Sequence, residues 1–246
     1  MRVRAALHVH STLSHDGTLM LSEVSELYRE RGFHLVAIGE HSQDMDEDKV
    51  RSLIDQCARH SSADFLMLPG IEFSCLPEGL HIFGAGVTAL TRDTDPLSVA
   101  RHIRASGGFS VLAHPSRQKW QHADGLLGAV DAAELWNIGY DGKYLPAVQA
   151  PAAFRRMRSV NPSLLAVAVH DLHRKVSFYN SAMVMEFDAL AKEPVISALR
   201  RGRYTIESPF FSADADGSAS WPGMWSLRLF AGPLRSMRKV KARLAR

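Results

Sequence analysis

The sequence predicts an α/β protein folded as a single distorted barrel of alternating strands and helices. Short apolar runs, typical of buried strands, alternate with segments in which apolar residues recur every three or four positions, as on one face of a helix. The chain has 246 residues, and α/β barrels of roughly 200–250 residues commonly form one domain. With 46% hydrophobic and 22% charged residues, the composition excludes a disordered, collagen-like or coiled-coil chain.

The expected strands are the short apolar runs. In chain order they cover residues 3–7, 33–38, 65–68, 80–84, 109–113, 132–136, 164–169 and 203–206. Pro69 and Gly70 end the third run, because both residue types interrupt regular structure. Since strand and helix patterns alternate along the chain, we expect a parallel sheet whose carboxyl ends lie along one edge.

The expected helices fill the intervals between the strands. They cover residues 21–28, 50–57, 97–104, 152–157 and 195–201, with one further short helix before residue 132. Gly32 ends the first helix, and Gly107 and Gly108 end the third. With about seven strand–helix units and no evident linker before residue 207, we expect residues 1–206 to form one (β/α)7 barrel resembling a TIM barrel.

The C-terminal segment, residues 207–246, differs from the barrel in composition. Residues 207–223 are rich in Ser, Ala, Asp, Gly and Pro, which predicts a loop. Apolar residues then recur at a helical spacing among basic ones, at Leu234, Met237, Val240 and Leu244. This pattern predicts a short basic amphipathic helix that packs on the barrel or extends from it. Its basic face is suited to weak contact with an acidic partner.

The positive charge of the chain is concentrated in this tail. The formal net charge is +3, from 29 basic and 26 acidic residues, and residues 228–246 hold seven basic side chains and no acidic one. Setting those seven aside leaves 22 basic against 26 acidic residues. A mildly acidic body argues against a stable complex with nucleic acid.

Cysteine usage and the N-terminal segment indicate the compartment. Cys57 and Cys75 cannot form a disulfide framework, and their spacing matches no zinc motif. The first residues lack the apolar core of a signal peptide, and no run of 18 apolar residues exists. We therefore expect a cytoplasmic protein with no transmembrane segment.

Metal-ligating side chains gather where the expected strands end. In parallel α/β folds, functional groups collect just past the carboxyl ends of the strands. Nine candidates meet this condition: His8, His10, Asp16, His41, Glu72, His81, His114, Asp171 and His173. Imidazole and carboxylate are ligands for Zn, Mn or Fe, and nine exceed the needs of one tetrahedral ion. The pattern therefore predicts two or three clustered divalent ions, with Glu72 suited to bridge two of them.

The spacing within two of these motifs supports the same conclusion. His8 and His10 lie two residues apart on a strand, so both side chains point to one face. Asp171 and His173 repeat that spacing. Either pair alone is weak evidence, but several strands delivering ligands to one edge is not a chance pattern.

The motifs around these residues resemble those of the PHP (polymerase and histidinol phosphatase) family of metallohydrolases. The residues that carry the resemblance, in the family's order, are His8-Val9-His10-Ser11 with Ser14, Asp16 and Gly17; Glu40-His41-Ser42; Pro69-Gly70-Ile71-Glu72-Phe73-Ser74; His81-Ile82-Phe83-Gly84; Ala113-His114-Pro115; Glu134 and Asn137; and Asp171-Leu172-His173. They span residues 8–173. The later stretch 198–203 is similar to the end of some PHP phosphoesterases.

The resemblance implies a distorted (β/α)7 barrel with a trinuclear metal site. It implies three ligand groups, which are His8, His10, Glu72 and Asp171 for the first ion, Glu72, His81 and His114 for the second, and Asp16, His41 and His173 for the third. A hydroxide held between the ions would attack phosphorus, and the ions would offset the charge that develops on the phosphoryl oxygens.

Further roles follow from the same resemblance and from position. Glu72 and His173 are the expected catalytic residues. Arg117, after His114-Pro115, and Arg174, after His173, are placed to bind phosphate. Glu134 is expected beside the ligands as a supporting carboxylate.

The sequence departs from the family pattern at two places. Gly39-Glu40 stands where the family has Thr-Asp, and Glu40 is expected to orient His41 by a hydrogen bond. Val169-His170 stands where the family has Gly-Ser, which could alter packing beside the metals. Neither departure removes a proposed ligand. His170 borders the cluster, as does His15.

The expected activity is hydrolysis of a small phosphorylated substrate or a nucleotide end. One alternative keeps the metals and changes the bond to a carboxyl ester, carbamate or amide. Converging Arg and Lys side chains would favour phosphate, and an apolar lining would favour the alternative. A second alternative is a non-catalytic, metal-stabilised binding module, which predicts a closed ion cluster with no open position.

Overall fold

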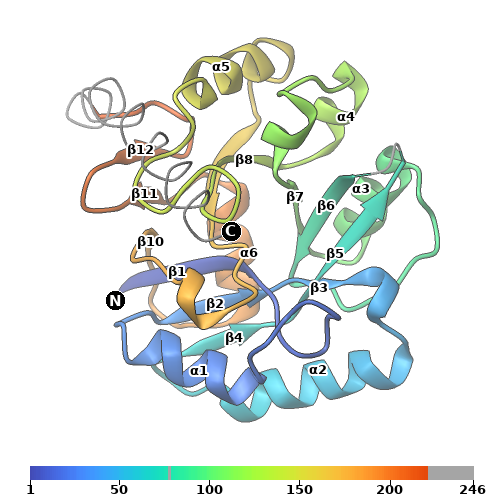
Figure 1. Cartoon of the computed structure of the whole chain (residues 1–246), viewed down its shortest axis with the longest axis vertical. Coiled ribbons are helices and arrows are strands. Elements are labelled where there is room, and N and C mark those ends of the chain that lie inside the picture. Colours follow the sequence, from blue (N-terminus) through green and yellow to red (C-terminus); the bar gives the residue numbers. More distant parts are fainter. Residues whose placement is uncertain (77–78, 221–246) are drawn as a thin grey trace, which may run out of the picture.

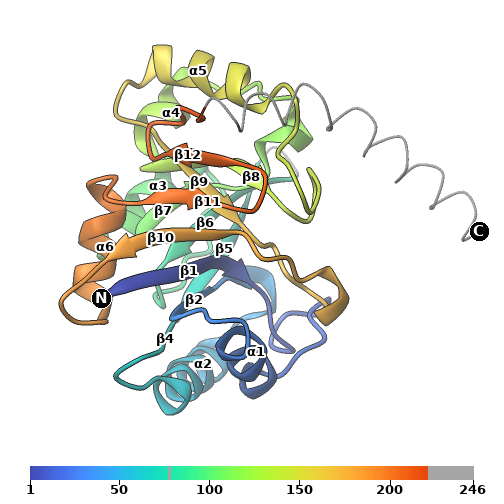
Figure 2. The ribbon, with the colours of Figure 1, turned by 90° about the vertical axis from the view of Figure 1, so that its left-hand side faces the viewer.

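The computed structural model describes residues 1–76 and 79–220, which form a mixed α/β fold of two six-stranded sheets (Figures 1 and 2). The first sheet has the strand order β12 (Ser212–Asp214), β11 (Thr205–Glu207), β10 (Ala182–Glu186), β1 (Arg2–Val9), β2 (Leu35–Ile38) and β4 (Leu66–Leu68). The second has the order β3 (Glu40–His41), β5 (Gly70–Cys75), β6 (Leu80–Ala85), β7 (Phe109–Leu112), β8 (Ala132–Asn137) and β9 (Leu165–Val169).

Six α-helices lie within the described residues: α1 (Leu21–Arg29), α2 (Glu47–His60), α3 (Pro96–Ala105), α4 (Asp124–Ala129), α5 (Ala150–Val160) and α6 (Lys192–Arg200). Three short 3-10 turns, η1 (Ser42–Asp44), η2 (Pro115–Gln118) and η3 (Lys175–Ser177), each follow a strand end that carries a predicted ligand. Side-chain caps mark the starts of α2 and α3. Asp46 accepts from the backbone of Lys49 at 2.8 Å, and Asp95 accepts from that of Ser98 at 2.9 Å. No helix of the described part is long and apolar enough to cross a membrane.

The two sheets meet at two seams and do not close into one continuous barrel. At the first seam only Gly39 separates β2 from β3, and its N–H donates to the carbonyl of Val9 at 2.9 Å. At the second, beside β1 and β9, the N–H of His170 donates to Leu7 and that of His10 donates to Leu172, both at 3.0 Å. The molecule is therefore barrel-like, with single hydrogen bonds where a closed barrel would have full ladders.

The expected all-parallel sheet is wrong, because both sheets contain antiparallel pairs. Parallel pairing holds between β1 and β2, β2 and β4, β3 and β5, β7 and β8, and β8 and β9. Strand β5 instead forms an antiparallel pair with β6, and β6 with β7. Residues 76–79 are too few to hold a crossover helix, so β5 and β6 must pair as a hairpin. The strands at 70–75 and 182–186 were not among those predicted.

The segment after residue 206 contains a strand where a loop was expected. Strand β12 pairs antiparallel with β11, in the register Ile206 to Ala213. The turn between them is closed by the N–H of Ser208, which donates to the carbonyl of Phe211 at 2.9 Å. Residues 207–220 therefore extend the first sheet. The predicted basic helix from Leu234 lies outside the described residues.

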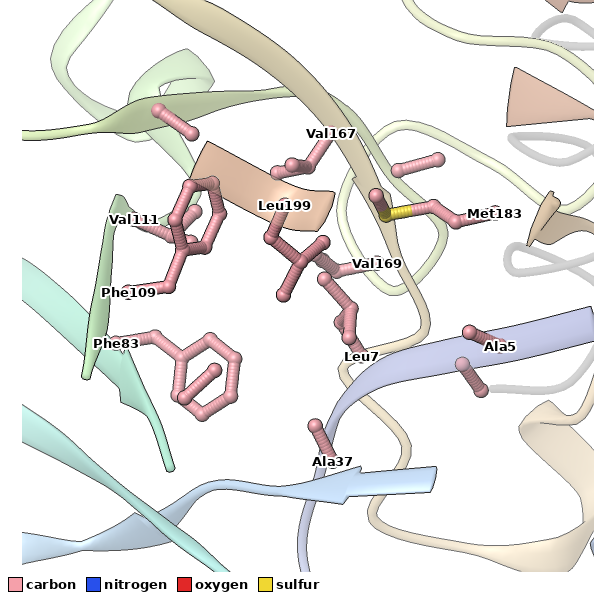
Figure 3. Close-up of a cluster of buried hydrophobic side chains, with 14 of the residues drawn as sticks. Ala5, Leu7, Ala37, Phe83, Phe109, Val111, Val167, Val169, Met183 and Leu199 are labelled. Carbon is pink, nitrogen blue, oxygen red and sulfur yellow. The ribbon is translucent and has the colours of Figure 1, made fainter. Parts of the chain in front are cut away.

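The core between the sheets is filled by apolar side chains from both sheets and from α6 (Figure 3). Leu7, Val111 and Val169 come from three different strands, and each is fully buried. Leu199 of α6 lies among them, also fully buried. Figure 2 shows α6 beside the amino-terminal end of β1, so this helix covers the end of the barrel-like core opposite the carboxyl ends of the strands. The polar candidate ligands occupy that carboxyl end.

Candidate metal centre

Glu72, at the middle of β5, is surrounded by histidines on both of its carboxylate oxygens. Its Oε1 lies 2.9 Å from His81 Nδ1 and 3.0 Å from His114 Nε2. Its Oε2 lies 2.8 Å from His41 Nδ1 and 3.4 Å from His8 Nε2. Only 1% of Glu72 is exposed. One buried carboxylate therefore faces ring nitrogens of five histidines, from four strands or strand ends, once His10, whose Nε2 is 3.7 Å away, is included.

The histidines and Glu72 fall into three groups. Within each group, the candidate ligand atoms lie within 4.8 Å of one another. These groups are His8 with His10 and Glu72, Glu72 with His81 and His114, and His10 with His41 and His173. Asp171 approaches the first group, with Oδ1 3.5 Å from His10 Nε2. Asp16 approaches the last group through His41 and His173. The structure thus brings together all nine residues that the sequence singled out.

Several buried ring nitrogens in these groups lack a hydrogen-bond partner among the described residues. They include His8 Nε2, both ring nitrogens of His10, and His41 Nδ1. A buried polar atom without a partner costs about 1–3 kcal/mol, so such atoms seldom gather without a reason. Imidazole nitrogens facing carboxylate oxygens form a donor set that suits divalent transition metals. The residues present therefore fit a metal centre.

Glu134 fixes the orientation of His8. Its Oε1 accepts from His8 Nδ1 at 2.9 Å, which leaves Nε2 as the atom directed at Glu72. Its Oε2 accepts from the backbone N–H of His114 at 2.5 Å and from the side-chain amide of Asn137 at 2.8 Å. That amide also donates to Asp171 Oδ2 at 3.1 Å. One carboxylate and one amide therefore hold three of the candidate ligands in place.

A strand irregularity allows Glu134 and Asn137 to face the same side. Residues three apart on a regular strand point to opposite faces. The pairing of β8 with β9 shifts in register between Glu134 and Trp136, as a β-bulge does. The bulge offsets the alternation, and both side chains reach the cluster.

Three candidate ligands adopt a left-handed backbone conformation that is rare for residues other than glycine. The φ angles are 60° at His8, 30° at His114 and 47° at Asp171. Such conformations cost of order 1–3 kcal/mol and concentrate at functional sites. Gly39 makes room for one of them, because a Cβ there would lie 2.9 Å from the His8 ring. The strained backbone at these three residues therefore helps to direct their side chains into the cluster.

The cluster is open to solvent on the side of Asp16 and His173. Asp16 Oδ1 lies 3.3 Å from His41 Nε2, and Oδ2 lies 3.2 Å from His173 Nε2. The side chain of Asp16 is 42% exposed and that of His173 is 26% exposed, against at most 5% for His8, Glu72 and Asp171. This edge is therefore where a substrate can reach the cluster.

Electrostatics within the cluster are dominated by the buried carboxylates. Burial alone would raise the pKa of Glu72, but the charge of His8 and the close ring nitrogens of His114 and His41 hold it well below its usual value. Burial alone would lower the pKa of His8, but Glu72 and Asp171 raise it well above the ordinary range. A bound cation would take the place of the proton on His8, because histidine ligates as the neutral ring.

His10 behaves differently although it is equally buried. Burial lowers its pKa to about 4, and the nearby carboxylate of Asp171 offsets only part of that effect. His10 is therefore neutral near pH 7, the form that ligates metals.

Glu40 lies near His41, but its carboxylate does not reach the His41 ring as expected. Its Oε1 accepts from the backbone and hydroxyl of Ser11, at 3.0 and 2.6 Å, and its Oε2 accepts from the hydroxyl of Ser14 at 2.5 Å. The Ser14 oxygen in turn accepts from the backbone N–H of His41 at 3.0 Å. Glu40 therefore fixes the loop that carries Asp16, and acts on His41 only through its backbone. Burial raises the pKa of Glu40.

The two predicted phosphate-binding arginines differ in position. Arg117 is exposed on η2, and its guanidinium carbon lies 5.4 Å from the ring centroid of Tyr140, which contacts His114. Arg174 is exposed immediately before η3, and within the described residues its guanidinium makes no hydrogen bond or ion pair with the cluster. Arg117 therefore lies beside Tyr140, a neighbour of the candidate ligand His114, and Arg174 has no such ring contact within the described residues.

His170 and His15 border the cluster but have other partners. The Nε2–H of His170 donates to the carbonyl of Ser181 at 2.9 Å, and its Nδ1 accepts from the hydroxyl of Tyr28 at 2.7 Å. Burial lowers the pKa of His170 to about 4. His15 Nδ1 lies 2.7 Å from Asp44 on η1. His170 is thus a structural residue.

Sequence reasoning assigned no role to Asn137, Ser14 or Tyr140. The sequence indicated Asn137, since it belongs to a motif with Glu134. The direction of its side chain toward the cluster depends on the bulge in β8, which the sequence did not predict. Ser14 likewise belongs to a recognised motif. Tyr140 carried no signal in the sequence, because it lies on a loop with no pattern around it.

Comparison with known proteins bears on the fold. No family model matches the sequence, and no curated protein matches it. Among solved structures, a two-domain protein from Bacteroides vulgatus that contains a predicted PHP-like metal-dependent phosphoesterase matches with a TM-score of 0.56 at 18% identity. That match covers 84% of this chain and 65% of the other, so this chain spans less than two thirds of that protein's length.

Two further solved structures match over most of their length. A candidate metal-dependent phosphoesterase from Bifidobacterium adolescentis gives a TM-score of 0.53 at 16% identity, over 79% of this chain and 94% of the other. An amidohydrolase from Chromobacterium violaceum, with bound sulfate and no metal, gives a TM-score of 0.55 at 14% identity. The match covers 83% of this chain and 98% of the other. These likenesses confirm, at the level of fold, the resemblance to PHP metallohydrolases that the motifs indicated.

Proposed function

We propose that this chain is a metal-dependent hydrolase, and specifically a phosphoesterase that cleaves a small phosphorylated substrate or a nucleotide end. The observation that carries the proposal is the cluster around Glu72, in which one buried carboxylate faces histidines from both sheets. Several of their ring nitrogens lack a hydrogen-bond partner among the described residues. Two structural neighbours support it: the Bacteroides vulgatus protein, which contains a predicted PHP-like metal-dependent phosphoesterase, and the candidate metal-dependent phosphoesterase from Bifidobacterium adolescentis.

The cluster suits two or three divalent ions of Zn, Mn or Fe. His8, His10 and Asp171 would hold one ion together with Glu72, and His81 and His114 would hold a second that shares Glu72. Asp16, His41 and His173 would hold a third ion. Ions bound there would supply Lewis acidity and a water that is deprotonated at neutral pH.

The protein's own residues would position the reactants. Glu134 and Asn137 keep His8 and Asp171 oriented, which spares reorganisation during reaction. His173 and Asp16 stand at the solvent-facing edge, where a water molecule would protonate the leaving oxygen. Arg117 would bind the phosphate from the side of His114.

An amide or carboxyl ester hydrolase is the second candidate, and one observation favours it. A structural neighbour is an amidohydrolase, and the donor set that would activate water for attack on phosphorus would also activate it for attack on a carbonyl. Arg117 beside the cluster favours an anionic substrate instead. A closed, non-catalytic metal module fits less well, because Asp16 and His173 are exposed.

Metal analysis combined with a substrate panel tests the proposal. The purified protein, loaded in turn with Zn, Mn and Fe, is assayed on generic phosphomonoesters, phosphodiesters, carboxyl esters and amides. We expect metal-dependent turnover of a phosphate ester and none of the carbonyl substrates. We also expect His10→Ala to abolish turnover with the far-ultraviolet circular dichroism unchanged. Turnover by a metal-free protein in chelator, or by His10→Ala at the wild-type rate, would refute the mechanism.

A further inference from the structure

Arg117 is an exposed cation held beside the cluster without an acidic partner. It lies on η2, three residues after His114, whose carbonyl accepts from the Arg117 backbone N–H at 2.9 Å. Within residues 1–76 and 79–220, its guanidinium makes no salt bridge with an Asp or Glu side chain. A guanidinium left without a carboxylate is available for an anionic ligand.

Tyr140 lies between this guanidinium and a candidate metal ligand. Its ring centroid is 5.0 Å from that of His114 and 5.4 Å from the Arg117 guanidinium carbon. The Tyr140 backbone N–H donates to the side-chain oxygen of Asn137 at 3.1 Å. Because the Asn137 amide also contacts Glu134 and Asp171, the same residue that orients the ligands fixes the base of Tyr140.

Gly79 lies next to Arg117 on another side, at an ordinary contact distance. Gly79, in the turn before β6, has a φ of +83°, and a Cβ there would lie 3.5 Å from Arg117 Nη2. The neighbouring Gln118 donates to the Gly79 carbonyl at 2.5 Å, which ties η2 to this turn. The arginine is therefore confined by the Tyr140 ring and by the turn that precedes His81.

We propose that Tyr140 is a positioning residue that holds Arg117 by a cation–π contact for binding the anionic group of the substrate. The proposal rests on the proposed function, since it takes the ligand to be a phosphate near the metal ligands. A free arginine side chain must lose rotamer freedom when it binds an anion. A guanidinium already held over an aromatic face has lost much of that freedom, so Tyr140 acts on phosphate affinity through Arg117.

Calorimetric titration of the metal-loaded protein with inorganic phosphate tests the proposal without requiring turnover. The variants are Arg117→Ala, Tyr140→Leu, the double variant and Tyr140→Phe. From the usual strength of an exposed cation–π contact, we expect Tyr140→Leu to weaken phosphate binding about two- to fivefold. Tyr140→Phe, which keeps the ring, should bind as the wild type does. In the Arg117→Ala background, Tyr140→Leu should cause no further loss.

Tyr144→Leu is the matched control. Tyr144 is 46% exposed, close to the 49% of Tyr140, but its ring contacts Tyr179 and Phe210. We expect its phosphate affinity to be unchanged. Where a substrate is found, Tyr140→Leu should raise KM by the same factor as the loss of phosphate affinity and leave kcat unchanged.

The outcomes separate this proposal from the proposed function. Additive effects of Arg117→Ala and Tyr140→Leu, or a loss in Tyr140→Phe equal to that in Tyr140→Leu, would overturn the positioning role. Coupled effects on phosphate binding would support it even in a protein that turns over no phosphate ester. Turnover of a phosphate ester with no coupling would leave the proposed function intact and remove this inference.

Discussion

Two buried regions at the carboxyl ends of the strands are built around histidine, yet their surroundings differ. Around Glu72, ring nitrogens face carboxylates, and several have no other partner among the described residues. Around His170, the ring lies among Tyr28, Phe33 and Phe178, and both nitrogens are satisfied by neutral groups. His8 and His170 are equally inaccessible to solvent for practical purposes, at 0% and 3% exposed.

The contrast shows that the partners of a buried histidine, and not its burial, decide its use. Carboxylate neighbours raise the pKa of His8, whereas burial among neutral groups lowers that of His170 to about 4. Neutral partners satisfy a ring and make it part of the core. Carboxylates that face ring nitrogens without matching hydrogen bonds indicate a place for a cation. Four experiments test this division.

The largest effect is expected at Glu72. Glu72→Gln removes the charge that faces histidines on both carboxylate oxygens and should lower kcat/KM by about a thousandfold or more, the scale of losing a principal electrostatic group. Metal content by mass spectrometry should fall with it. His170→Gln, assayed at pH 7.5, is the control and should keep its metal. Equal metal loss in both variants would erase the distinction between the two regions.

Removing metal should destabilise the protein. Ions that bind only the folded state stabilise it by about 3–4 kcal/mol at 100 to 1,000 times their dissociation constant. We expect chelator to lower the thermal midpoint of the wild type and of His170→Gln alike, and to leave that of Glu72→Gln almost unchanged. An unshifted wild-type midpoint would mean that the cluster holds no ion.

His170 should make stability depend on pH. Its pKa is about 4 in the folded protein, below the ordinary 6.5, so between these values the unfolded chain binds more protons. The free energy of unfolding should therefore fall as the pH drops from 6.5 to 4, by about 3 kcal/mol from this residue. Denaturant titrations of wild type and His170→Gln across that range should converge at low pH. Parallel curves would show that His170 does not titrate as the structure indicates.

The smallest effect is expected at Glu134, which contacts the candidate ligands His8 and His114 but is not itself a candidate ligand. Glu134→Gln should weaken metal binding about 10- to 100-fold, the usual cost of losing a group that orients a ligand. Competition with a chromogenic chelator measures this affinity. Glu207→Gln, a surface carboxylate paired with Arg2, is the matched control and should show no change.

The sequence predicted which residues gather in one cluster better than it predicted the strand arrangement. All nine candidate ligands lie in one cluster. Most of them stand at or just past a strand end, and these ends converge in an α/β fold, whereas Glu72 lies within β5 and Asp16 lies on the loop after β1. The β5–β6 pairing was missed because Pro69 and Gly70 suggested an end to the strand, where in fact a new one begins at Gly70. The carboxylate of Glu40 binds Ser11 and Ser14 and does not reach the His41 ring. This choice of partner depends on how the loop packs, which the spacing of residues in the sequence does not encode.

Backbone conformation explains the remaining gap. The left-handed angles at His8, His114 and Asp171 and the bulge in β8 redirect side chains, and none has a sequence signal of the kind that glycine provides. Tyr140 shows the same limit, since only the folded loop places it beside His114.

The position of β1 has a consequence for synthesis on the ribosome. This first strand lies between β2 and β10, pairing Arg2 with Glu186, and Leu199 of α6 completes the core against it. One edge of β1 therefore stays unpaired until β10 has been translated, near the end of the described chain. A nascent chain halted before β10 would carry an open strand edge and an unfilled core, which makes it a natural client for chaperones that shield unfinished sheets.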